Sequence, residues 1–265
     1  MPDSPTVPWE DALRDAYLEG RANVFLLHGA VYDFQFDPTE GFLSLGESVG
    51  QLLGRSRSFV VTVDGAGDAE LSHADKPATV RSAFSWARPG TRDIAEVLNG
   101  GPTVLLPALG RLLCAPAHPC GVVLLQAELL LTSPASVAKV RRWLDAPGIR
   151  QTNNVAVLIA DRADALPTQL LQHPRLCALR VGRPSAAVRV AALRNELGDR
   201  LAGVPDARLA LATHEHTLIE VAALCSRLAG ATAESVSQHF PHGADAPMGD
   251  SAAPESEPAV ESIDA

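Results

Sequence analysis

The sequence of 265 residues contains few aromatic side chains, few lysines and no long hydrophobic run. Because no apolar stretch reaches the roughly 18 residues needed to cross a bilayer, we expect no membrane span. The first residues include acids and no basic segment before an apolar one, so we expect no secretory signal and a cytoplasmic protein. The four cysteines form no CxxC pair and each has apolar neighbours, which favours buried thiols over a metal site or a disulfide.

The charge of the chain argues against binding to nucleic acid. There are 31 Asp and Glu against 22 Lys and Arg, and the only lysines are Lys76 and Lys139. No basic stripe of the kind that follows a phosphate backbone is present. Six of the acids lie in residues 241–265, a segment rich in Pro, Ser and Ala with little to bury. We therefore expect a disordered acidic tail there and no nucleic-acid partner.

The apolar pattern predicts an α/β fold with a mostly parallel sheet flanked by helices. Apolar residues make up 46% of the chain, which is enough for a sizeable core. Continuous apolar strands that alternate with helices are typical of a sheet covered on both faces. Strands are predicted over residues 24–27, 58–64, 154–160 and from 121 onward, and helices over 8–20, 43–53, 105–116 and 136–146.

The same pattern divides the chain into four parts. Residues 1–21 form an N-terminal helix, 22–183 the α/β core, 184–240 a small helical subdomain, and 241–265 the acidic tail. Within the core, Gly and Pro interrupt residues 65–102, so we expect loops there with one or two short helices.

The order of segments in the second half resembles an AAA+ ATPase module. The strand that begins at Gly121 and is followed by Glu128 resembles a Walker B segment. Residues 159–167 resemble the sensor segment, which places Asp161 and Arg162 at the sensor position. The resemblance implies that Arg175 stands where an arginine finger would lie and that Arg189 is the lid arginine.

The first half resembles the N-terminal module of certain bacterial two-module AAA-type ATPases. The similarity is carried by Asn23, the buried strand after it, and the pattern His-Gly-x-Val-x-Asp at residues 28–33. It implies a P-loop NTPase-like core followed by a helical lid.

The residues of ATP hydrolysis are missing from these segments. A phosphate-binding loop needs a glycine-rich turn with Lys and Ser or Thr, and neither Lys76 nor Lys139 fits that pattern. The Walker-B-like strand lacks an adjacent Asp-Glu pair, and Asp161 and Arg162 replace the usual sensor Asn or Thr. We therefore expect a degenerate module with no catalytic residue, no metal and no cofactor, in which ATP is possible but not expected.

The sequence predicts a non-catalytic AAA+-like subunit or adaptor that assembles with an active AAA+ ATPase or a larger oligomeric complex. A divergent nucleotide-binding ATPase and an unrelated α/β protein-interaction domain are the alternatives. A GxSxG pattern around Ser48, with Asp161 and His214 in the order of a hydrolase triad, is weaker because no clear buried strand precedes it. His214 and His216 stand two apart, which is not the spacing of a zinc-binding helix.

Overall fold

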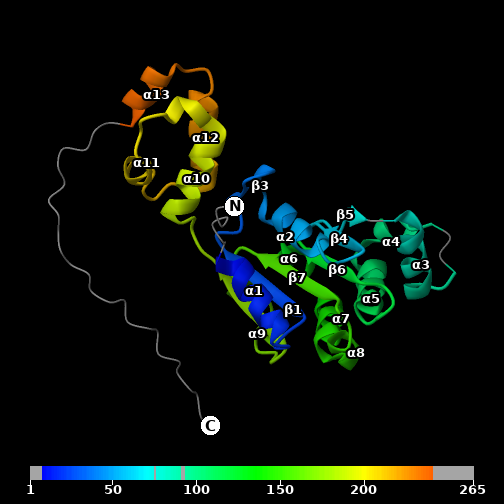
Figure 1. Ribbon diagram of the computed structural model, residues 1–265. Coiled ribbons are helices and arrows are strands. Elements are labelled where there is room, and N and C mark those ends of the chain that lie inside the picture. The colour runs from blue at the N-terminus through cyan, green and yellow to red at the C-terminus, as the bar shows by residue number, and fades with distance from the viewer. Residues whose placement is uncertain (1–7, 75, 91–92, 241–265) are drawn as a thin grey trace, which may run out of the picture.

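A six-stranded sheet with helices on both faces forms one part of the molecule, and a group of helices lies beyond one end of it (Figure 1). The structure is a computed structural model that describes residues 8–74, 76–90 and 93–240. The predicted acidic tail and the first seven residues of the predicted N-terminal part lie outside the described residues. No helix in the described ranges is both long enough and apolar enough to traverse a bilayer.

The elements up to residue 181 are a mixture of strands and helices, and the later elements are helical. The strands are β1 (Val24–Gly29), β2 (Gln35–Asp37), β3 (Gly41–Leu43), β4 (Phe59–Val63), β5 (Ala69–Ala74), β6 (Cys120–Leu124), β7 (Val155–Ala160) and β8 (Leu176–Val181). The helices up to β8 are α1 (Pro8–Leu18), α2 (Leu45–Gly54), α3 (Pro77–Ala87), α4 (Ala95–Leu98), α5 (Gly101–Leu113), α6 (Ala127–Leu130), α7 (Pro134–Asp145), α8 (Pro147–Arg150) and α9 (Thr168–Leu171). The later helices are α10 (Ala186–Leu197), α11 (Asp206–Ala212), α12 (Leu218–Leu228) and α13 (Ala233–His239), and 3₁₀ turns occur at Ala163–Ala165 and Gly198–Leu201.

The strand order of the main sheet is β5-β4-β6-β7-β1-β8. All neighbouring pairs are parallel except β4 and β5, which form an antiparallel edge. The first strand of the chain therefore lies between the last two, with Leu27 opposite both Ile159 and Leu179. This arrangement confirms the predicted mostly parallel sheet.

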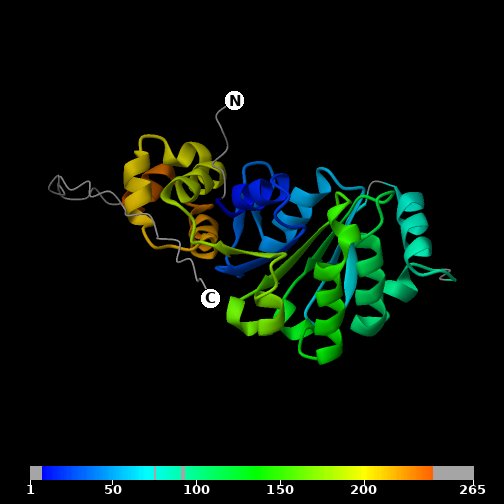
Figure 2. The same ribbon diagram turned by 90° about the horizontal axis from the view of Figure 1, so that it is seen from below.

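Alternate residues of the strands build two separate cores. Val24 and Leu26 of β1 belong to the core under α3, α5 and α7, whereas Phe25 and Leu27 belong to the core under α1 and α2. Figure 2 shows this layering, with the blue helices on one side of the sheet and the green helices on the other. Burial on both faces explains why these strands read as continuous apolar runs in the sequence.

A buried amide joins the amino end of β7 to the helices behind the sheet. The Asn154 side chain accepts a hydrogen bond from the Cys120 amide at 2.8 Å. Its Nδ2 atom donates to the carbonyls of Leu112, Leu113 and Ala115 at the end of α5. Asn154 thereby adds a hydrogen bond to each of these carbonyls and fixes the end of α5 to the sheet.

The helical group shares its core with the β2–β3 hairpin. Phe36 is buried in the same cluster as Leu193 and Leu224, and the half-buried Phe34 and Phe42 pack against that cluster. The Phe36 and Phe42 rings lie 5.7 Å apart in an edge-on arrangement. The hairpin, although part of the N-terminal half, therefore connects the α/β part to the later helices.

The structure differs from the sequence prediction in residues 65–102, where it contains the strand β5 and an eleven-residue helix α3. The Asp64 carboxylate accepts hydrogen bonds from the amides of Ala66 and Asp68, and this turn reverses the chain so that β5 pairs with β4. Pro77 then starts α3 at a position where the missing N–H is harmless.

The boundaries of three further segments also differ. The helix predicted over 105–116 spans residues 101–113, and the strand predicted from 121 ends at Leu124. The hairpin of β2 and β3 was not predicted, and α2 begins after it, with Ser44 as the N-cap of a capping box completed by Glu47.

Candidate functional site

The loop after β1 is held between the carboxyl ends of its two neighbouring strands. The Gly29 amide donates to the Asp161 carbonyl and the Ala30 amide to the Val181 carbonyl, each at 3.0 Å. The Val31 amide turns back to the Gly29 carbonyl at 2.8 Å. Gly29 has φ +106°, and a Cβ there would lie 2.7 Å from the Val181 carbonyl oxygen, so the position requires glycine.

Asp33, four residues further on, binds the N-terminus of α12. Its carboxylate accepts hydrogen bonds from the amides of Leu218 and Ile219, both at 3.0 Å, and from the Phe34 amide at 2.9 Å. The side chain is only 8% exposed. A helix N-terminus favours a nearby negative charge, and here the protein supplies that charge itself across 185 positions of sequence.

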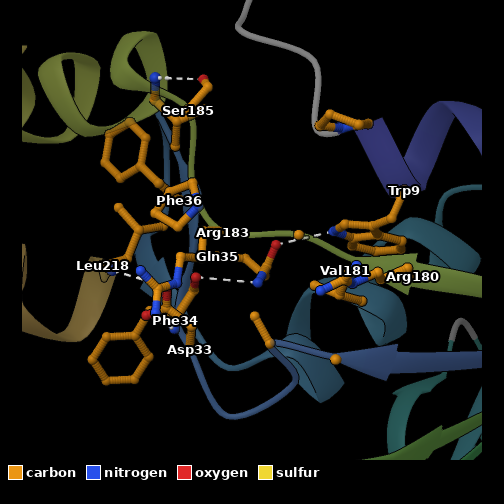
Figure 3. A pocket seen from close by; sticks show the side chains of 16 residues that line it. Trp9, Asp33, Phe34, Gln35, Phe36, Arg180, Val181, Arg183, Ser185 and Leu218 are labelled. Atoms are coloured by element: carbon orange, nitrogen blue, oxygen red, sulfur yellow. Dashed lines mark hydrogen bonds between the residues drawn. The ribbon is translucent and has the colours of Figure 1, made fainter. Parts of the chain in front are cut away.

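A cavity of about 740 Å³ opens between this loop, the end of β8 and the helical group (Figure 3). Its walls are mostly apolar and include Trp9, Phe34, Phe36, Val188 and Leu218. Ligand sites of α/β proteins lie at this carboxyl edge of the sheet, and pockets of this size and character hold small ligands or side chains.

The polar groups in the floor of the cavity are bonded to one another. The Trp9 indole donates to the Gln35 side-chain oxygen at 3.0 Å, and the Gln35 amide donates to the Phe34 carbonyl at 3.1 Å. The Ser185 hydroxyl accepts from the Val188 amide at the start of α10. These bonds leave an apolar surface with few unused hydrogen-bonding groups.

Two arginines, Arg180 and Arg183, line the cavity from the end of β8 and the segment after it. Both are exposed, and neither guanidinium forms a hydrogen bond or ion pair with another side chain in the described ranges, although the charge of Arg183 helps to lower the pKa of the Glu220 carboxyl. Burial and the nearby charge of Arg180 lower the pKa of the His28 imidazole. The cavity therefore combines apolar walls with positive charge.

The predicted Walker-B-like and sensor-like acids both influence Tyr32, in the loop after β1. Partial burial, followed by the charges of Glu128 and Asp161, raises the pKa of the Tyr32 hydroxyl. Glu128 has one carboxylate oxygen buried without a hydrogen-bond partner among the described residues. Arg162 points instead to Asp164, in an ion pair with Nε and Oδ1 2.9 Å apart.

The expected position of Glu128 at the end of a strand is corrected by the structure. Strand β6 stops at Leu124, and Glu128 belongs to the short helix α6. Gln126, which precedes that helix, has the left-handed conformation with φ 48°, a strained position for a residue other than glycine.

Arg175 and Arg189, the arginines implied by the family resemblance, lie outside the cavity lining. Arg175 precedes β8, at the opposite end of the sheet, and donates to the carbonyls of Leu144 and Asp145 at 3.1 and 3.2 Å. Arg189 is buried in α10, donates to the Pro184 carbonyl and keeps its Nε without a partner among the described residues. The structure therefore places Arg175 at the end of the sheet opposite to Asp161.

The hydrolase and metal patterns are not assembled by the fold. Ser48 lies within α2 rather than at a strand-to-helix turn, and its hydroxyl contacts the Glu10 carboxyl at 3.5 Å. Among the described residues, no group of three or more His, Cys, Asp or Glu is placed to hold a metal ion.

Sequence reasoning found some residues of the cavity and missed others. Asp33 was part of the His-Gly-x-Val-x-Asp pattern, although its partner on α12 could not be read from it. Trp9, Gln35 and Arg180 carried no local signal because they come from separate segments that only the fold brings together.

The parallel sheet covered by helices, with a cavity at its carboxyl edge, defines a Rossmann-like α/β domain. The family described as "AAA+ chaperone, N-terminal Rossmann-like domain" matches residues 1–182, more than half of the chain. The chain belongs to this family, which confirms the resemblance to an AAA+-type N-terminal module. A search of curated proteins gives no match. The alternative of an α/β domain unrelated to AAA+ proteins is therefore wrong.

Proposed function

We propose that this chain is a non-catalytic AAA+-type module that acts by binding a protein partner, either an active AAA+ ATPase or a larger assembly. The observation that carries the proposal is the loop after β1. A phosphate-binding loop presents free backbone N–H groups and leads directly into a helix. Here the amides of Gly29, Ala30 and Val31 are bonded to carbonyls, and the chain continues into the β2–β3 hairpin.

The charges around that loop support the same proposal. Asp33 occupies the helix N-terminus that an anion would otherwise approach, and Glu128 and Asp161 add negative charge near Tyr32. The two lysines do not compensate, because Lys139 on α7 donates to the Thr103 carbonyl and Lys76 is the N-cap of α3. A phosphate-binding loop supplies a lysine to the β- and γ-phosphates, and residues 29–34 contain none.

In this proposal residues 22–183 form the core, 184–240 the lid-like subdomain, and the protein acts in the cytoplasm. Arg175 marks the edge that faces a neighbouring subunit, and Arg189 stabilises the junction between the core and the helical subdomain. The bonds of Arg175 to the end of α7 hold its guanidinium at that edge.

A divergent nucleotide-binding ATPase is the second candidate, and the cavity beside the end of β1 favours it. Titration with a fluorescent ATP analogue separates the two candidates. We expect no saturable binding up to ~1 mM, the upper end of ordinary substrate affinities, and ATP turnover below ~0.01 per second. Saturable binding with turnover that disappears in Glu128→Gln would establish the ATPase instead.

The adaptor role needs its own measurement. Light scattering should show that the full chain forms a complex with a candidate AAA+ ATPase, and Arg175→Ala should weaken this complex while circular dichroism stays unchanged. Lys139→Ala provides a control on α7, the helix whose last carbonyls Arg175 binds. The proposal would be contradicted if the ATPases that co-purify with the chain from native cells formed no complex with it in this measurement.

A further inference from the structure

We propose that the cavity between β8 and α12 binds an acidic segment of a partner protein, with an apolar side chain inside and flanking carboxylates on Arg180 and Arg183. This inference rests on the adaptor function proposed above and specifies where the partner is held. It follows from the lining of the cavity and from the charge at its mouth.

The floor of the cavity selects for an apolar group. Trp9, Gln35, Asp33 and Ser185 have their polar atoms bonded within the protein. A polar uncharged group that entered would lose hydrogen bonds to water without replacement, at a net cost. An aromatic or long aliphatic side chain would instead bury its surface against Phe34, Val188 and Leu218 of the lining.

The mouth of the cavity selects for negative charge on both sides of that apolar group. In Figure 3, Arg180 lies on the side of Trp9 and Arg183 on the side of Leu218. Neither guanidinium has an ion-pair partner in the described part of the chain. Guanidinium groups pair with carboxylates through two parallel hydrogen bonds, so two arginines around an apolar floor fit a segment with acids on either side of one apolar residue.

The size of the cavity fits such a segment. Its volume of about 740 Å³ lies within the range of 300–1,000 Å³ that is usual for binding pockets, so that it accommodates a large side chain with its neighbouring backbone. A lysine-bearing segment would meet like charges at the same place, and repulsion of this kind excludes wrong partners.

The proposal is tested by calorimetric titration of the full chain with three hexapeptides, each acetylated and amidated at its ends. The first has aspartates on both sides of one phenylalanine, the second has lysines in place of the aspartates, and the third has alanine in place of the phenylalanine. We expect saturable one-to-one binding of the first peptide and binding at least about tenfold weaker for the other two.

Two substitutions at Gly182 provide a matched pair of variants. Gly182 lines the cavity between the two arginines, and a Cβ there would have no heavy atom within 4 Å, so a side chain fits without strain. Gly182→Asp should abolish peptide binding because it places a carboxylate at the mouth, whereas the uncharged Gly182→Ala should weaken binding far less. Arg183→Gln should weaken binding about tenfold, and Arg81→Gln on the exposed side of α3 should have no effect.

The outcomes separate this inference from the function on which it rests. Equal binding of the aspartate and lysine peptides, no saturable binding, or unchanged binding in Gly182→Asp would overturn it. Displacement of the peptide by AMP or ATP would show a nucleotide site and overturn both the inference and the adaptor function. If the parent protein and Gly182→Asp associate equally well with an ATPase, the adaptor function stands and only this binding site is refuted.

Discussion

The two ends of the parallel sheet use their arginines in opposite ways. At the amino end, Arg175 donates to two carbonyls of α7, which have no partner within that helix. At the carboxyl end, Arg180 and Arg183 line a cavity, and their guanidinium groups form no hydrogen bond within the described ranges. The arginine at the arginine-finger position is therefore partly structural, whereas the two arginines of the cavity keep their guanidinium groups unbonded.

The acids show a related difference. Asp33, at the carboxyl end, is buried and accepts three amide hydrogen bonds, two of which join two parts of the molecule. Asp145, at the amino end, is exposed and pairs with His173 at 3.0 Å. Substitutions at the carboxyl end should therefore change stability more than those at the amino end.

The largest effect is expected for Asp33→Ala. Loss of the carboxylate leaves the amides of Phe34, Leu218 and Ile219 without an acceptor, and this should lower the free energy of unfolding by about 3 kcal/mol. Urea denaturation measures the loss, and amide exchange should show faster opening at the start of α12. Asp199→Ala, an exposed acid in the helical part, should change stability little. Equal losses in both variants would show that Asp33 does not couple the two parts.

A smaller effect is expected for Gly29→Ala. The added Cβ would stand 2.7 Å from the Val181 carbonyl oxygen in a backbone region that L-residues avoid, which should destabilise the fold by about 2 kcal/mol. The control Gly182→Ala lies at the same edge of the sheet in open space and should leave the melting temperature unchanged. If Gly29→Ala melted like the parent protein, the loop after β1 would be able to shift away from β8.

Arg175→Ala should have a still smaller effect, about 1 kcal/mol, because two hydrogen bonds from a half-buried guanidinium are lost. Arg175→Lys keeps the charge but not the planar guanidinium, so thermal melting should place it between Ala and the parent. If the melting curve of Arg175→Ala coincided with that of the parent protein, these two hydrogen bonds would be formed only part of the time in solution.

The smallest effect is a pH dependence at the amino end. Because the Arg175 amide donates to His173 Nδ1, the proton lies on Nε2 and is donated to Asp145. This hydrogen bond lowers the pKa of the Asp145 carboxyl below its usual 3.8. The stabilisation is therefore present above pH 3.8 and is lost as the pH falls through the lowered pKa.

The measurement is the melting temperature between pH 2.5 and 6 for the parent and Asp145→Asn. The two curves should converge at the acid end, where the carboxyl is protonated, and separate above about pH 4. Curves that run parallel over the whole range would show that Asp145 and His173 do not interact in solution.

Much of the sheet could be predicted from sequence, but its edges could not. The strands β1, β4, β6 and β7 are buried on both faces, so each appears as a continuous apolar run. The edge strand β5 alternates between half-buried and exposed residues and includes Glu70 and His73, which hides it within a stretch rich in Gly and Pro. The pairing of β5 with β4 depends on the turn at Asp64, which is held by hydrogen bonds from backbone amides to the Asp64 side chain. The periodicity of apolar residues gives no information about such bonds.

The candidate site shows the same division more sharply. Motif reasoning identified Glu128 and Asp161, whose charges both influence Tyr32, but it also named Arg175, which lies at the far end of the sheet. The His-Gly-x-Val-x-Asp pattern contained Asp33 but did not indicate what it binds, because the amides from which it accepts hydrogen bonds across the fold are on α12.

The sequence by itself determined the class of this protein, since runs of apolar residues and helical periodicity are local properties that a chain carries before it folds. It also determined the family, which rests on the order of segments within residues 1–182. Only the tertiary structure decided where charge and apolar surface meet. The walls of the cavity come from α1, the end of β8 and α12, which are far apart in sequence. Only the packing of these elements brings together Trp9, Arg180, Arg183 and Leu218 around one cavity.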